Sequence, residues 1–145
     1  MEVSETFIVR AHNSHILTEK KDQKYFKKSF ILRVDATRPG CIFQIKRIND
    51  KPVNYSYKGD IMITADGDRL NVINILDIDD YLVGVLRAEV GGMYQPDFLK
   101  SMAIISRTYT LRNLGKNLDK GFDLTDQVDC QVYVGVNNFE KKIVN

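Results

Sequence analysis

The sequence has few cysteines and histidines, the residues typical of disulfide-rich and metal-binding proteins: it has two of each, and it has no tryptophan. Cys41 and Cys130 are too few for a disulfide framework, and the sequence leaves open whether they form one bridge. His12 and His15 lie far from Cys130 in a strand-rich segment, which is poor geometry for zinc ligands. We therefore expect no metal and no cofactor. A serine or cysteine triad would also lack a nearby histidine.

No apolar run reaches the roughly 18 residues that a membrane-spanning helix needs. The first residues do not resemble a secretory signal, so export would need a leader outside this chain. Gly91-Gly92 has neither the spacing nor the Lys-Ser/Thr of a phosphate loop. The formal net charge is only +2, and the lysines crowd one segment, Lys20 to Lys28. We expect that segment to be a solvated loop, so no nucleic-acid partner is predicted.

The first 76 residues predict short strands separated by turns. Arg38-Pro39-Gly40 and Asp66-Gly67-Asp68 are turn signals of this kind. Such spacing is typical of a small antiparallel sheet or barrel-like unit. The predicted strands are Phe7–Val9, Phe30–Val34, Cys41–Ile45, Ile61–Thr64 and Leu70–Leu76.

The pattern then changes to a helical period. One helix is predicted from Asp77 to about Glu89 and a second from Pro96 to about Leu114, with strand character returning from Phe122. The fold class is therefore α+β: a short-stranded antiparallel sheet unit in residues 1–76, followed by two packed helices and a further strand region in residues 77–145. With 145 residues, 43% of them hydrophobic, we expect one domain with a real core. Its abrupt ending suggests truncation at the C-terminus.

Glu89 is the one misplaced charge of the first helix. It follows Leu82 by seven residues and Val85 by four, which puts its carboxyl on the apolar stripe. It also lies at the C-terminal end, where the helix dipole disfavours a negative charge. Desolvation and dipole both favour the protonated form, which general-acid chemistry requires. The alternative to a catalytic role is a structural one, in which the helix end is frayed or Glu89 forms an ion pair with an arginine.

Arg107 lies in the second helix, which is apolar around most of its circumference and is therefore expected to be central. A guanidinium there needs a carboxylate or carbonyl partner, and Glu89 is the obvious candidate if the two helices pack together. The alternative is an Arg107 side chain that extends to solvent.

Three segments in order resemble the SpoIID/LytB family of bacterial cell-wall proteins: INILDIDDYLVGVLRAEV, PDFLKSMAIISRTYTL and FDLTDQVDCQVYVG. An upstream Tyr57-Lys58-Gly59 fits that family's Tyr-x-Gly element. No single segment is specific, but three in register are.

The resemblance implies a peptidoglycan lytic transglycosylase in which Glu89 is the catalytic acid. Such an enzyme cleaves the β-1,4 bond from N-acetylmuramic acid to N-acetylglucosamine and leaves a 1,6-anhydro sugar. One carboxylate suffices, because the substrate's own C6 hydroxyl attacks, whereas most glycosidases need two. The implied partner is the glycan strand, and the implied location is the cell envelope.

The other predicted substrate-binding residues are Lys100, Arg107, Gln131 and Tyr133. Gln131 and Tyr133 alternate along the predicted last strand, so both could donate hydrogen bonds to a sugar. Solvent exposure of Lys100 and core packing of Tyr133 are the alternatives. Val90 and Tyr94 stand where the family has Met and Trp. A non-catalytic glycan-binding enhancer of a cell-wall amidase is therefore the alternative function, and a scaffold that holds a protein complex together is a third hypothesis.

Overall fold

A computed structural model describes residues 8–20, 23–27, 29–32, 43–45, 56–91 and 95–135. The chain divides into two compact units, each described by itself: Met1–Arg33 with Asp60–Ile75, and Val34–Gly59 with Leu76–Asn145. Short antiparallel strands and two long helices confirm the α+β class. The domain division at residue 76 stays a prediction.

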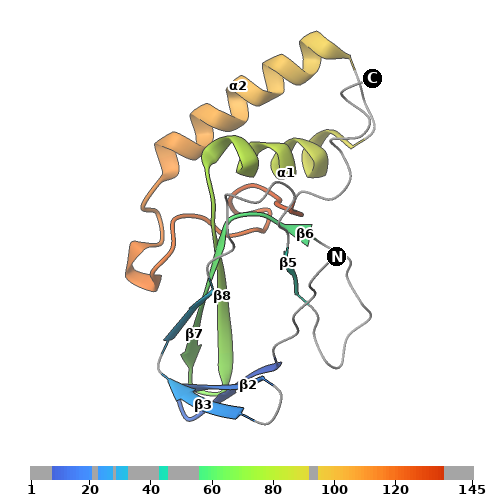
Figure 1. The fold of residues 1–145 in the computed structure, drawn as a ribbon. Coiled ribbons are helices and arrows are strands. Elements are labelled where there is room, and N and C mark those ends of the chain that lie inside the picture. The colour runs from blue at the N-terminus through green and yellow to red at the C-terminus, as the bar shows by residue number, and fades with distance from the viewer. Residues whose placement is uncertain are drawn as a thin grey trace, which may run out of the picture. The chain divides into compact units, whose positions relative to one another are not determined.

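The first unit contains two three-stranded antiparallel sheets (Figure 1). One has the order β1-β2-β3 and the other β4-β7-β8. The strands are β1 (Ile8–His12), β2 (His15–Lys20), β3 (Gln23–Lys27), β4 (Ser29–Leu32), β7 (Asp60–Asp66) and β8 (Arg69–Ile75). The strands predicted around residues 8, 30, 61 and 70 are therefore confirmed. The loop predicted for Lys20 to Lys28 was wrong, because β2 and β3 pair there, and composition does not show backbone pairing.

Two hairpin turns of this unit bind one another. Asn13 and Ser14 both have positive φ, at 48° and 58°, as a type I′ turn requires. Gly67 has a φ of 58° in the turn that joins β7 to β8, which confirms the predicted Asp66-Gly67-Asp68 turn. The Ser14 amide donates to the Gly67 carbonyl at 2.8 Å, and the Gly67 amide donates to Ser14 Oγ at 3.0 Å. Ile16, in strand β2 directly after the first of these turns, is fully buried.

The second unit contains helix α1 (Ile78–Val90), helix α2 (Pro96–Asn113), the short 3₁₀ helix η1 (Leu118–Lys120) and the strand pair β5 (Phe43–Gln44) and β6 (Ser56–Tyr57). Both predicted helices are confirmed within a residue or two. Asp77 is the N-cap residue by position but makes no side-chain capping bond, and Gly91, with φ 64°, ends α1. Pro96 opens α2, where its missing N–H costs nothing.

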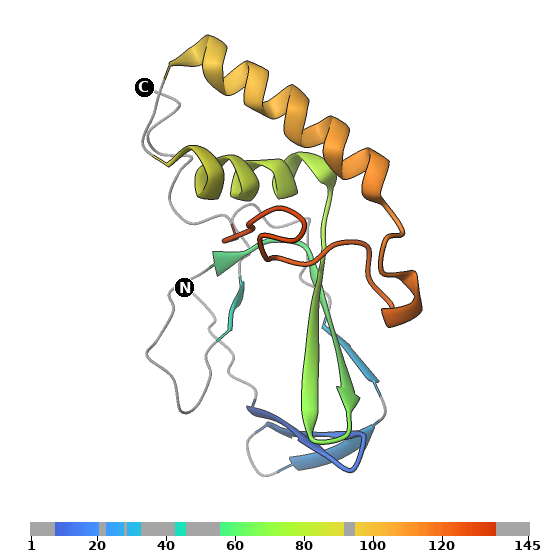
Figure 2. The same ribbon diagram turned by 180° about the vertical axis from the view of Figure 1, so that it is seen from behind.

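The prediction that α2 is central was wrong. The two helices pack side by side (Figures 1 and 2), but only Ser106 and Thr110 of α2 are buried. Ile104 is 67% exposed and Leu111 54% exposed. The two fully covered side chains are small and polar, so the apolar content of the helix did not reveal which residues pack most closely. None of the helices in the described part of the chain is both long and apolar enough to cross a bilayer.

The strand region predicted from Phe122 is replaced by turns and extended chain. Between Phe122 and Gly135 the structure has one isolated bridge, Phe122 with Asn117, and no strand. The chain returns beneath α1 in both views (Figures 1 and 2). Residues 131–135 nevertheless alternate in burial, with Gln131, Tyr133 and Gly135 inside. The period-two pattern therefore predicted the burial but not the pairing.

Candidate functional site

Glu89 lies in the last turn of α1 and its side chain is exposed. The burial predicted for it was therefore wrong. Leu82 and Val85 on the same stripe are 4% and 0% exposed, so the apolar face itself is real. Packing on that stripe ends before the helix does, and Val90 is buried at the end instead. Helical periodicity gives a face, but not how far along the helix the face is covered.

The Glu89 carboxylate accepts a hydrogen bond from the backbone of a remote segment. The Val132 N–H donates to Glu89 Oε1, with an N···O distance of 3.1 Å. Among the described residues no hydrogen-bond partner is found for Oε2. One oxygen of the carboxylate is thus held by a backbone donor, while the side chain as a whole is exposed.

Gln131 anchors this segment to α2. Its Oε1 lies 2.8 Å from Thr110 Oγ1, and its Nε2 donates to the Ser106 carbonyl at 3.4 Å. Thr110 Oγ1 is also 2.8 Å from the Ser106 carbonyl, and its single proton serves one acceptor at a time. Gln131 is 8% exposed. Its amide is used inside the protein, and its contact with a sugar stays a prediction.

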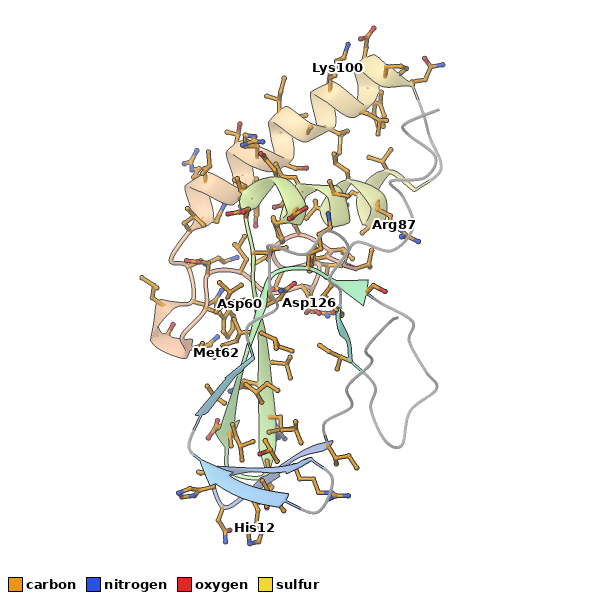
Figure 3. The ribbon with its side chains drawn as sticks, in the orientation of Figure 1. His12, Asp60, Met62, Arg87, Lys100 and Asp126 are labelled. Atoms are coloured by element: carbon orange, nitrogen blue, oxygen red, sulfur yellow. The ribbon has the colours of Figure 1, made fainter. Side chains whose placement is uncertain are left out.

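Tyr133 packs on α1 at a glycine. A Cβ added to Gly84 would lie 2.4 Å from Tyr133 Cε2, so only glycine lets the ring come this close. The ring also packs against Tyr81, with centroids 5.1 Å apart, and Tyr57, at 6.1 Å. Tyr133 is 7% exposed, which matches the core-packing alternative. Its amide donates to the carbonyl of Asp126 at 3.3 Å (Asp126 is labelled in Figure 3).

Tyr81 adds a protonated phenol to this cluster. Burial, with smaller contributions from Cys130, Tyr109, Asp126 and Glu89, raises the pKa of Tyr81 to about 12. Burial also raises the pKa of Tyr133. Both phenols therefore stay neutral at physiological pH. The Tyr81 hydroxyl lies 3.5 Å from Gln131 Oε1, so it supports the same anchor.

Arg107 pairs with a carboxylate, as predicted, but not with Glu89. Its Nη2 bonds Asp79 Oδ1 in the first turn of α1, and the Arg107 side chain is 47% exposed. The helices cross so that the middle of α2 meets the start of α1 rather than its end. The prediction of a Glu89 partner was therefore wrong. The Asp79 carboxylate is favourable in the first turn of α1, where the helix dipole is positive, and it is this carboxylate that holds the Arg107 charge.

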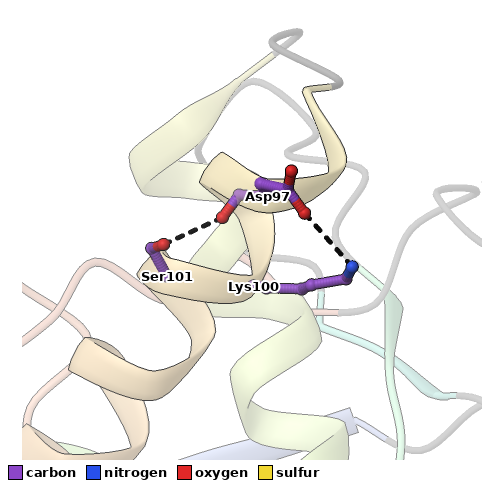
Figure 4. Close-up of polar contacts among 3 residues, drawn as sticks. All are labelled: Asp97, Lys100 and Ser101. Atoms are coloured by element: carbon purple, nitrogen blue, oxygen red, sulfur yellow. Dashed lines mark hydrogen bonds and ion pairs between the residues drawn. The ribbon is translucent and has the colours of Figure 1, made fainter.

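Lys100 lies on the exposed side of α2, and its side chain is 74% exposed (Figures 3 and 4). Its Nζ bonds Asp97 Oδ1 at 3.2 Å, while the Ser101 hydroxyl donates to the Asp97 carbonyl at 2.8 Å (Figure 4). An ion pair this exposed contributes little to stability, so Lys100 can exchange it for a ligand at small cost.

Two lysines of this unit, Lys58 and Lys116, also make side-chain contacts. Lys58, within the Tyr57-Lys58-Gly59 element, bonds Asp80 Oδ1 at 3.1 Å and ties that element to α1. Lys116 Nζ lies 3.5 Å from Cys130 Sγ. Desolvation acts against ionisation of this thiol, but hydrogen bonds from Thr125 and Lys116 outweigh it and lower the pKa of Cys130. Cys130 is a free thiol, while Cys41 and Tyr94 fall outside the described residues. No group of three potential metal ligands occurs in the described ranges.

Comparison with known proteins gives the family. The model of the SpoIID family, described as Stage II sporulation protein, matches residues 66–145, more than half of the chain. The chain belongs to the SpoIID family. That family is associated with cell-wall lytic activity, which implies association with peptidoglycan. An uncharacterized protein of Brachyspira hyodysenteriae is 36% identical over 80 residues, 54% of this chain and 22% of that protein. The chain thus spans about a fifth of this curated relative's length. No solved structure matches the chain.

Sequence reasoning missed three groups in this unit. The Val132 amide is a backbone donor, which no side-chain pattern reveals. Asp79 was recognised as a first-turn acid but not as the partner of Arg107. Thr110 could have been found, because a threonine on an otherwise apolar helix is a signal that a buried polar partner is needed.

Proposed function

We propose that this SpoIID domain is a peptidoglycan lytic transglycosylase with Glu89 as its single acid and base. The observation that carries the proposal is the state of the Glu89 carboxylate. The resemblance assigns Glu89 the catalytic role, its side chain is exposed, and Oε1 accepts a hydrogen bond from the Val132 amide. A general acid must reach the leaving oxygen directly, and an exposed, oriented carboxyl does so.

The reaction needs one carboxyl group used twice. Protonated Glu89 gives its proton to the glycosidic oxygen between N-acetylmuramic acid and N-acetylglucosamine as the C1–O bond breaks. The C6 hydroxyl of the same muramic acid then attacks C1, and the Glu89 carboxylate takes the hydroxyl proton. The products are a free N-acetylglucosamine hydroxyl and a 1,6-anhydro end, and Glu89 is protonated again. No water is consumed, which distinguishes this chemistry from two-carboxylate hydrolysis.

Lys100 and Arg107 are the proposed glycan contacts on α2. Both carry exposed positive charge, and the Lys100 pair with Asp97 is weak enough to open. Gln131 and Tyr133 are buried, and we assign them to positioning rather than to a sugar. The proposed location is the cell envelope.

The decisive experiment is a product assay on purified glycan strands. Wild type is expected to release muropeptides with 1,6-anhydro ends, detected by mass spectrometry. Glu89→Gln should lower the rate by about 10²–10⁴-fold, because general acid–base catalysis contributes that much. Asp119→Asn is the matched control, since it neutralises an exposed carboxylate in η1 that has no role in the proposed site. Full turnover in Glu89→Gln would remove the mechanism.

A second candidate is a glycan-binding enhancer of a separate cell-wall amidase, with no chemistry of its own. The exposure of Glu89 favours it, because the catalytic hypothesis started from a carboxyl buried on the apolar stripe of α1, and that burial is not found. This function predicts that wild type and Glu89→Gln bind sacculi equally, release no product and accelerate an added amidase to the same extent. The appearance of anhydro ends with wild type alone would rule it out.

A further inference from the structure

Residues 131–133 form a clamp with a backbone donor at its centre. Gln131 and Tyr133 are 8% and 7% exposed, while Val132 between them is only half-buried. In extended chain, alternate side chains point to the same side. The two flanking side chains therefore point into the unit, and the middle residue offers its N–H to Glu89, 43 positions earlier in the sequence.

Each side of the clamp is tied to a different helix. On one side, the Gln131 amide contacts Thr110 Oγ1 at 2.8 Å and the Ser106 carbonyl at 3.4 Å, both on α2. On the other side, the Tyr133 ring sits on Gly84 of α1. A segment that is fixed at both ends has little freedom to move its central amide.

The backbone of the clamp is fixed independently of Glu89. The Tyr133 amide donates to the Asp126 carbonyl at 3.3 Å, and the Gly135 backbone lies against Ser56, where a Cβ would come 2.2 Å from the Ser56 carbonyl. The position of the Val132 N–H is therefore fixed by contacts that do not involve Glu89. Such preorganised backbone donors are how proteins orient charged groups without reorganisation during the reaction.

We infer that the Val132 N–H is a positioning group for Glu89: it holds Oε1 so that Oε2 is the oxygen that exchanges protons with the glycan. The inference rests on the proposed transglycosylase function for its kinetic consequence, but the contact itself does not. Gln131 and Tyr133 act through this amide, so they are positioning residues and not sugar ligands. Because the donor is the backbone N–H of residue 132, the contact with Glu89 depends on that N–H and not on which side chain the residue carries.

The kinetic test removes the donor and leaves Glu89 in place. Val132→Pro lacks the N–H, and Val134→Pro, two residues along the same extended segment, is the matched control with the same backbone restriction. Val132→Pro should lower kcat on glycan strands by about tenfold or more with KM little changed, because misorientation affects the chemical step. Val134→Pro should retain kcat. Equal kcat in two folded variants, verified by circular dichroism, would overturn the inference.

A second measurement is independent of activity and of the folding of Val132→Pro. In ¹H–¹⁵N spectra of the full chain, the Val132 amide proton should move upfield in Glu89→Ala, because the charge-assisted hydrogen bond is lost. The Tyr133 amide is the internal control, since its acceptor is Asp126. An unmoved Val132 resonance overturns the inference even if the chain is an active enzyme. A moved resonance with no anhydro product from wild type supports the contact while the proposed function fails.

Discussion

Gly84→Ala tests the contact on which the site is built. The added methyl would lie 2.4 and 2.6 Å from two carbons of the Tyr133 ring and 2.7 Å from the Gly135 carbonyl. Non-bonded carbons prefer about 3.5–4.0 Å, so the ring must retreat by about 1 Å. Overpacking of this kind costs about 1–3 kcal/mol. Alanine recovers up to about 1 kcal/mol through its higher helix propensity.

Because three atoms are crowded at once, including a backbone oxygen, we take the upper half of the overpacking range. The net loss of unfolding free energy is then about 1–2 kcal/mol. For a chain of this size the midpoint of thermal unfolding should fall by roughly 2–8 °C. Calorimetry or circular dichroism on the full chain measures it.

A double-mutant cycle separates the ring contact from other effects of the methyl group. In a Tyr133→Val background the ring is absent, so Gly84→Ala should cost less than it does in wild type. A Gly84→Ala variant that is as stable as wild type or more stable would refute the reasoning, because helix propensity would then outweigh the contact. A penalty unchanged by Tyr133→Val would place the strain at Gly135 instead.

The ionisable groups of this unit allow three more tests. Tyr81 keeps its proton in the folded chain up to a pKa of about 12, whereas the unfolded chain loses it near 10, so stability is full below pH 10 and falls as the pH rises toward 12. Tyr81→Phe should flatten that fall in urea unfolding at alkaline pH, and an unchanged slope would contradict the assignment. Arg107→Gln and Asp79→Asn should couple by about 0.2–1 kcal/mol in a double-mutant cycle, as exposed ion pairs do. The effects of Arg107→Gln and Glu89→Gln on the free energy of unfolding should be additive, because these residues do not pair. A measured coupling between them would instead indicate that Arg107 does pair with Glu89.

The local features of this protein could be read from the sequence. Pro96 marked the start of α2, Gly91 the end of α1, and Gly67 the hairpin between β7 and β8. Each depends on the backbone preferences of one or two residues, which act whatever the rest of the chain does. The family could also be predicted from short segments of the sequence, and the family model that matches residues 66–145 confirmed that assignment.

The site depended on contacts between residues far apart in the chain. Periodicity placed Glu89 on the apolar stripe of α1, yet only the packing showed that the stripe is uncovered at its end. The sequence predicted that Arg107 pairs with Glu89 if the two helices pack together. In the packed helices Arg107 pairs with Asp79 instead, at the other end of α1. The helices, the turns and the position of Glu89 in the last turn of α1 could be predicted from the sequence alone. Tertiary structure decided which oxygen of that acid is held and by what, because a backbone amide has no signature in a sequence of side chains.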